Sequence, residues 1–182
     1  MPDVFVHSTA MLRKVFTSYE PKQVSAITTS TADHIPSIDT LSGTISFAAE
    51  DGGNDLHGTV SLSFACTYVK YELEVAGDEG SVLLQRKLKV GDPGYIVTIT
   101  DKNGQERLRE DYKYAGIENE FIAFANACNS RRDNNDGNEN VEDDFGDCNT
   151  PLEAMRDIEL VEAFLESGKE NGKPILLLER DH

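Results

Sequence analysis

The sequence predicts an α+β fold: a largely antiparallel, open sheet of six or more strands with helices packed on one face. Two observations indicate the sheet. Between residues 24 and 111, apolar and polar side chains alternate in short segments, and glycine, asparagine and aspartate residues at turn positions separate these segments. A third observation, apolar residues at helical spacing near both ends of the chain, adds the helices.

A short helix is predicted after His7 and is expected to end near residues 17–21, with Arg13 on its polar side. Its apolar positions are Met11, Leu12, Val15 and Phe16. Eight strands are predicted next. They are expected at residues 24–31, 41–47, 56–64, 71–75, 81–84, 88–90, 95–100 and 106–111. The turn chemistry of Asp51-Gly-Gly-Asn54 joins the second and third of these strands as a hairpin.

Two helices are predicted near the end of the sequence. Ile117, Phe121, Phe124 and Cys128 mark the apolar face of the first. The second begins at Thr150-Pro-Leu-Glu153, where Thr150 is the expected N-cap and Glu153 completes a capping box. It is expected to end at Gly168-Lys169, before a strand at 175–178 that is buried on both faces.

A length of 182 residues fits one domain, 1–182, with a polar and acidic surface insertion at 130–149. The insertion holds two Arg and seven Asp or Glu, but a calcium loop does not fit it. Placing Gly137 at the sixth position of an EF-hand loop puts Arg132 at the first ligand position.

The composition narrows the class of protein. A formal charge of −16 argues against nucleic acid or an anionic membrane as the partner, and a solvated acidic surface explains it. No apolar run approaches the roughly 20 residues that a membrane span needs, and no signal peptide pattern is present. The three cysteines do not have the spacing of metal ligands, so neither disulfides nor a metal site are predicted. Cys66 and Cys128 are expected in the core. These features favour a cytoplasmic protein.

Asp3 and His7 are the candidate catalytic residues. Their spacing of four places a carboxylate and an imidazole on one side of a helical turn, where the pair can transfer protons near neutral pH. The alternative is that Asp3 caps the helix and His7 is a solvated or packed side chain. The sequence contains no G-x-G-x-x-G, G-x-x-x-x-G-K-[ST] or G-x-S-x-G motif, so no cofactor-binding residue is expected in this chain.

Four stretches together resemble the C-terminal domain of the Gfo/Idh/MocA oxidoreductases, the glucose-fructose oxidoreductase and inositol dehydrogenase family. Each motif alone is weakly specific, and the match depends on their order and spacing along nearly the whole chain. The stretches are Asp3-Val-Phe-Val-His7 with the helix after it, Ile38-Asp-Thr-Leu41 with Gly43 and Phe47, Tyr71–Gly80, and Thr150–Asp157 running on to Glu166-Ser-Gly-Lys169.

The resemblance implies a domain that carries the substrate and mediates dimers, joined to a Rossmann domain that holds NAD or NADP. In the family, the Asp and His of the first motif work beside a Lys of the Rossmann domain, and the matching positions here are Asp3 and His7. Phe5 replaces the usual Gly of this motif, and Ser8-Thr-Ala10 replaces an acidic continuation, so contacts to the substrate are expected to differ there.

The first functional hypothesis is therefore the substrate-binding and dimerisation domain of an NAD(P)-dependent oxidoreductase that acts on a sugar, polyol or related diol. His7 is expected to move or position the hydroxyl proton and Asp3 to orient His7, and a homodimer is expected to form through the Ser/Thr-rich sheet face. We expect the chain alone to be inactive and to bind no cofactor. The alternatives are a non-catalytic regulatory or sugar-sensing protein of the same fold and a bare dimerisation module.

Overall fold

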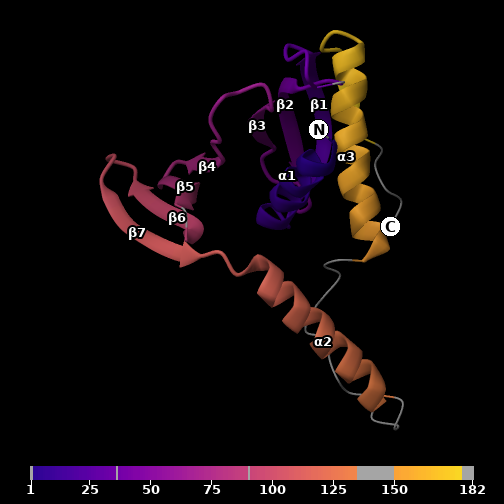
Figure 1. Cartoon of the computed structure of the whole chain (residues 1–182). Helices are drawn as coiled ribbons and strands as arrows, with labels where there is room; N and C mark the ends of the chain where they lie inside the picture. Colours follow the sequence, from indigo (N-terminus) through magenta and orange to yellow (C-terminus); the bar gives the residue numbers. More distant parts are fainter. Residues whose placement is uncertain (1, 36, 90, 135–149, 178–182) are drawn as a thin grey trace. The chain divides into compact units, whose positions relative to one another are not determined.

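The structure is a computed structural model that describes residues 2–35, 37–89, 91–134 and 150–177, and the chain forms two compact units (Figure 1). Described residues 2–67 and 150–177 belong to the first unit, and described residues 68–134 to the second. The first unit comprises α1 (Pro2–Val15), β1 (Tyr19–Thr29), β2 (Thr40–Ala49), β3 (Leu56–Ser63), α3 (Pro151–Lys169) and β8 (Ile175–Leu176). The second comprises β4 (Glu72–Gly77), β5 (Gly80–Lys89), β6 (Asp92–Asp101), β7 (Glu106–Lys113) and α2 (Gly116–Asn134).

The sheet of the first unit has the strand order β3-β2-β1-β8, and every neighbouring pair is antiparallel. Because side chains alternate along a strand, β1 and β2 each place every second residue on one face. That face is covered by α1 and α3, which lie beside β1 (Figure 1). The opposite face carries mostly hydroxyl side chains.

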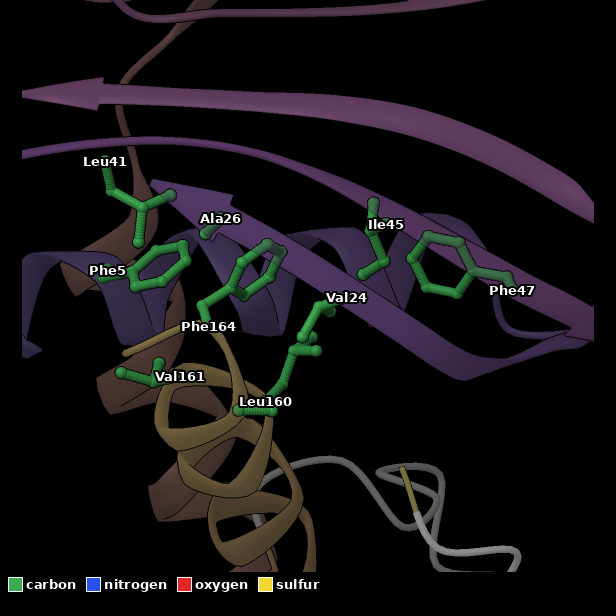
Figure 2. Packing of buried hydrophobic residues seen from close by; sticks show 10 residues of the cluster. Phe5, Val24, Ala26, Leu41, Ile45, Phe47, Leu160, Val161 and Phe164 are labelled. Carbon is green, nitrogen blue, oxygen red and sulfur yellow. The ribbon is translucent and has the colours of Figure 1, made fainter. Parts of the chain in front are cut away.

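The hydrophobic core of the first unit lies between this sheet and the two helices (Figure 2). Phe5 of α1 and Phe164 of α3 are buried, with ring centroids 5.4 Å apart in a tilted arrangement. Their rings point toward β1 near Ala26 in the close view. The buried members of the core are Phe5, Val24, Ala26, Leu41, Ile45, Phe47, Leu160, Val161, Ala163 and Phe164.

Close backbone approach explains two glycines of the first unit. Gly43 faces Ala26 across the β1–β2 ladder, and a Cβ added to it would lie 2.5 Å from the Ser25 carbonyl oxygen. A Cβ at Gly168 would collide with the Thr28 side chain. Larger residues at these positions would force β2 or the end of α3 away from β1, so both glycines set how tightly the first unit packs.

The sheet of the second unit is an antiparallel meander, β4-β5-β6-β7. Gly80 begins β5 directly after the β4–β5 turn with a φ of +141°, a conformation that favours glycine. On one face of this sheet, Val75, Val82, Ile99 and Leu108 form a cross-strand apolar row. On the other face, Lys87 forms ion pairs with Asp92 and Asp111.

The α+β class and the antiparallel pairing are confirmed, but the eight strands in the described residues form two four-stranded sheets rather than one sheet. The two segments predicted at 81–84 and 88–90 are one strand, β5, whose pairing with β6 continues through Gln85–Lys87. The N-cap is also confirmed, because Thr150 Oγ1 accepts a hydrogen bond from the Glu153 backbone N–H at 3.2 Å. That the whole chain is a single domain stays a prediction.

Several burial predictions were wrong. Cys66 and Cys128 are exposed, although both lie in apolar sequence patterns. Phe121 and Phe124 on α2 are 71% and 69% exposed, so an amphipathic pattern alone did not place this helix face in a core. The final strand was expected to be buried on both faces, but Leu176 of the two-residue edge strand β8 is 71% exposed. Of the predicted insertion 130–149, residues 130–134 end α2, and residues 135–149 lie outside the described part of the chain.

Candidate active-site helix

Both candidate catalytic residues lie on α1, which begins earlier than the apolar pattern after His7 indicated. Asp3 and His7 are one helical turn apart on its backbone, as their spacing predicted. His7 is exposed, whereas Phe5 and Thr9 are buried, which places the imidazole on the side of the helix away from the core. The orientation of the Asp3 side chain lies outside the described part of the structure, so its contact with His7 stays a prediction.

The buried side of α1 is fixed to α3 by polar as well as apolar contacts. Arg13 Nη1 donates to Asp157 Oδ1 at 2.7 Å and to the Glu153 carbonyl oxygen at 3.2 Å, and Arg13 Nη2 pairs with the Glu153 carboxylate. The Thr9 hydroxyl lies 2.9 Å from the Val6 carbonyl oxygen and 3.3 Å from that of Asp157. These contacts hold the helix that presents His7 in one position relative to the sheet.

The electrostatics of this junction favour the charged form of Arg13. Burial acts to lower the pKa of Arg13, but hydrogen bonds and charge attraction from Asp157 and Glu153 outweigh burial, so the pKa is raised. The side chains of Arg13 and Asp157 are 12% and 13% exposed. Glu153 also accepts from Arg156 at 2.8 Å, so its carboxylate links two arginines in addition to being part of the first turn of α3.

Sequence reasoning placed Arg13 on the polar side of the helix, and the structure corrects this. A signal for its true position was present, since Phe5, Thr9 and Arg13 recur every four residues and therefore form one stripe on a helix. An arginine in that stripe needs a buried acidic partner, and α3 provides two. The missed feature was the pairing between helices far apart in the sequence.

Besides His7, the structure describes two other histidines. His34 is exposed in the connection between β1 and β2, His57 is exposed on β3, and His182 lies outside the described residues. Within the described ranges, no group of three or more His, Cys, Asp or Glu residues is arranged to hold a metal ion.

The outer face of the first sheet is built from aligned hydroxyl residues. The register places Ser25, Thr44 and Thr59 side by side across three strands, and the next row contains Ser42 and Ser61. Thr40 and Ser63 are hydrogen-bonded at 2.9 Å between their hydroxyl oxygens. Between residues 40 and 46 of β2 and residues 57 and 63 of β3, this face carries no Asp, Glu, Lys or Arg. It is a nearly uncharged surface that hydrogen-bonding groups dominate.

Comparison with known proteins places this architecture among oxidoreductases. The sequence matches no family model. It is 25% identical over 176 residues to the dehydrogenase FPY6 of Fusarium mangiferae, a match that covers 93% of this chain and 44% of that protein. An oxidoreductase from Sinorhizobium meliloti has a similar structure, with a TM-score of 0.73 and 18% identity, over 95% of this chain and 51% of the other. The solved structures that this fold resembles are Gfo/Idh/MocA-type oxidoreductases.

A second solved structure extends the comparison. An oxidoreductase from Agrobacterium radiobacter, in complex with NAD+, L-tartaric acid and magnesium, matches with a TM-score of 0.59 and 16% identity, over 94% of this chain and 47% of the other. The chain thus spans about half the length of the proteins that it matches. Among the described helices, none is both long and apolar enough to cross a membrane.

Proposed function

We propose that this chain is the substrate-binding and dimerisation part of an NAD(P)-dependent oxidoreductase that acts on a sugar, polyol or related diol. The observation that carries the proposal is the fold shared with about half of several oxidoreductases, combined with an exposed His7 on a helix that is fixed at its buried side. The relative that contains NAD+ and L-tartaric acid, a hydroxy acid with two neighbouring carbinol carbons, supports the choice of substrate class.

The proposed role of His7 follows from the chemistry of the reaction. When a carbinol carbon gives up a hydride, its hydroxyl must lose a proton, and an imidazole accepts a proton readily near neutral pH. His7 would accept this proton or hold the hydroxyl in position, and Asp3, one turn earlier on α1, would orient the imidazole. The contacts of Arg13 and Thr9 with α3 would keep His7 in place against the substrate.

The nicotinamide cofactor would supply the hydride chemistry, but the described residues of this chain do not fit its phosphates. Dinucleotide binding uses glycines at the start of a helix that follows a strand. Among the described residues, the glycines with positive φ lie in turns between strands, at the first residue of β5 or after the end of α3: Gly52, Gly80, Gly91, Gly104 and Gly172. We therefore assign no cofactor contact to this chain and propose that it binds neither NAD nor NADP by itself. Calorimetric titration of the purified chain with each dinucleotide tests this, and micromolar binding would contradict it.

The function is tested with the protein encoded by the gene that contains this sequence. NADH or NADPH formation is followed with a panel of aldoses, polyols and hydroxy acids. His7→Asn is expected to lower kcat by about 100-fold or more, the scale of lost acid–base catalysis. His34→Asn, which changes an exposed histidine in a loop, is the matched control and should retain activity.

Two outcomes would point away from this proposal. If His7→Asn leaves kcat unchanged, His7 is a solvated surface residue and another group moves the proton. If no member of the panel reduces the nicotinamide while one of the sugars binds, the protein is a sugar-sensing member of the same fold rather than an enzyme.

A further inference from the structure

Tyrosine is concentrated in the second unit, in one place. Five of the six tyrosines of the chain belong to this unit, and four of these surround Arg86 or share its sheet face. We call Tyr71, Arg86, Tyr95, Tyr112 and Tyr114 the tyrosine–arginine cluster. Neither the oxidoreductase fold nor the chemistry proposed for His7 explains it.

The strand register brings the cluster together. Arg86 of β5 is directly opposite Tyr95 of β6, and Tyr95 is directly opposite Tyr112 of β7, so all three side chains emerge on one face. Tyr71, just before β4, is held beside them because its carbonyl oxygen accepts from the Arg86 backbone N–H at 2.9 Å. Tyr114, just after β7, is held by its backbone N–H, which donates to the Pro93 carbonyl oxygen at 3.1 Å.

The side chains form a platform of neighbouring planar groups. The guanidinium carbon of Arg86 lies 5.9 Å from the centre of the Tyr114 ring, and the Tyr95 and Tyr114 rings are 6.3 Å apart with an angle of 38° between their planes. The Tyr112 and Tyr114 side chains are 48% and 43% exposed, so they leave ring surface accessible within their unit. Packing that served only to fill space would bury these rings.

Both hydrogen-bond donors and hydrogen-bond acceptors border the platform. Arg86 offers N–H donors, and no carboxylate in the described ranges forms an ion pair with it. Glu110 lies on the same face of β7 as Tyr112, and the Tyr112 hydroxyl donates to its carboxylate at 2.6 Å. Tyr71 is half-buried, and burial raises the pKa of its phenol, as does the neighbouring Tyr95, while Arg86 acts to lower it.

These groups fit an uncharged, hydroxylated ring better than an anion. A chain with a net charge of −16 repels anions, and Glu110 adds a carboxylate at the platform itself. A pyranose ring offers C–H bonds that lie flat against the negative face of an aromatic ring, as the positive edge of another ring does. Its hydroxyls both donate and accept, and so can use a guanidinium and a carboxylate together.

We propose that the tyrosine–arginine cluster is a binding platform for a neutral pyranose sugar. The Tyr114 ring stacks on the sugar, Arg86 donates to its hydroxyls, and Glu110 accepts from them. The cluster uses no residue of α1, and its test does not require dehydrogenase activity. Its failure and the failure of the function proposed for His7 are therefore distinguishable.

The chain provides its own reporter for this test, because it contains no tryptophan and five of its six tyrosines are in the second unit. Tyrosine fluorescence is followed while cellobiose, maltose or lactose is added to about 50 mM, well above the millimolar Kd of a weak small ligand. We expect a saturable change with at least one of these disaccharides. Citrate and inorganic phosphate should give none, because the platform discriminates against anions.

Variants assign the binding to the cluster. Tyr114→Leu is expected to raise Kd by about tenfold, the effect of losing one aromatic stacking interaction. Tyr114→Phe keeps the ring and should bind nearly as the parent does. Arg86→Gln should weaken binding, whereas Arg109→Gln, which changes an exposed arginine on the opposite face of the same sheet, should not. Circular dichroism of each variant checks that it folds.

Three results would overturn the proposal. The first is the absence of a saturable change with all three sugars. The second is equal weakening by Arg109→Gln and Arg86→Gln, which would show a general charge effect. The third is a smaller oligomer for Arg86→Gln together with unchanged sugar binding, which would make the cluster a protein–protein contact.

Discussion

Arg13 of α1 and Asp157 of α3, which are 144 residues apart in the sequence, are joined by a 2.7 Å hydrogen bond between Nη1 and Oδ1. Their side chains are 12% and 13% exposed, so the ion pair is largely shielded from water. Removing one partner of such a pair costs more than removing a surface ion pair, since the remaining charge keeps its burial and loses its compensation. The junction therefore contributes to the stability of the first unit and to the position of His7.

Replacing Arg13 by Met is expected to lower the free energy of unfolding by about 2–3 kcal/mol, because Asp157 loses its arginine partner and Glu153 keeps only its ion pair with Arg156. Urea denaturation followed by circular dichroism measures this. Lys173→Met is the matched control, because Lys173 and Glu170 form an exposed ion pair at 2.6 Å. The control should cost less than about 1 kcal/mol. Equal losses in the two variants would show that the Arg13 junction is no stronger than a surface pair.

The environment of Asp39 predicts how the stability of the first unit changes at acid pH. The Asp39 side chain is buried, and burial acts to raise its pKa. Hydrogen bonds to the carboxylate act in the opposite direction and outweigh burial. They come from the backbone N–H groups of Ala32 and Thr31 and from the hydroxyls of Thr40 and Thr31. The N–H bonds from Thr31 and Ala32 are 2.7 and 2.6 Å long. The net pKa is lowered, so the folded state holds the proton less tightly than the unfolded state does.

Because the pKa of Asp39 is lowered on folding, its contribution to stability is present above the ordinary aspartate value, about 3.9. It is lost as the pH falls from there through the lower value of the folded state. We expect Asp39→Asn to be less stable than the parent at neutral pH and to show a smaller further loss below pH 4. Denaturation midpoints between about pH 7 and pH 2.5 measure this. Parallel curves for the two proteins would exclude Asp39 as a source of the acid sensitivity.

The burial of Phe5 predicts how much stability the fold loses when this residue is replaced by the glycine that is usual in the family's first motif. Phe5 is 1% exposed and packs against Phe164, so its removal leaves a cavity between α1, α3 and the sheet. Phe5→Ala is expected to lower the free energy of unfolding by about 3–5 kcal/mol, and Phe5→Gly by somewhat more, because glycine also weakens the helix. Phe121→Ala, at a 71% exposed phenylalanine on α2, should cost less than about 1 kcal/mol. A cost at Phe121 as large as at Phe5 would mean that α2 is packed in solution.

The individual helices and strands of this fold could be predicted from the sequence, because the patterns that indicate them lie within short segments. Alternating side chains and turn residues located the β2–β3 hairpin, and the Thr150 cap fixed the start of α3 within one residue. The division of the strands into two sheets was not accessible, because it depends on which faces meet over long distances. The burial of Leu176 was mispredicted for the same reason, since an apolar segment does not reveal that it forms a sheet edge.

The candidate site was accessible only in part. The spacing of Asp3 and His7 predicted that they share a helical turn, and α1 contains both. The residues that hold this helix were missed, because Arg13, Glu153 and Asp157 act through an ion pair that connects opposite ends of the chain. The same holds for the tyrosine–arginine cluster, whose members lie on strands or directly beside them and are brought together only by the strand register.

The hydroxyl-rich outer face of the first sheet predicts how the proposed homodimer is disrupted. Thr44 is exposed on this face between Ser25 and Thr59 of the neighbouring strands. If two copies pack through this face, Thr44→Arg introduces an unpaired charge that the two-fold symmetry repeats near the centre of the interface. We expect the dimer Kd to rise by about 100-fold or more, since an uncompensated buried charge costs about 3–5 kcal/mol.

Light scattering coupled to size exclusion, over a range of protein concentrations, measures this change in dimer affinity. Ser37→Arg introduces the same charge at an exposed loop position of the same unit and should leave the dimer intact. If both Thr44→Arg and Ser37→Arg leave the dimer intact, the interface lies elsewhere. A parent chain that remains monomeric at high concentration would show that the hydroxyl rows are a solvated surface, because their hydrogen-bonding groups are then satisfied by water rather than by a second copy.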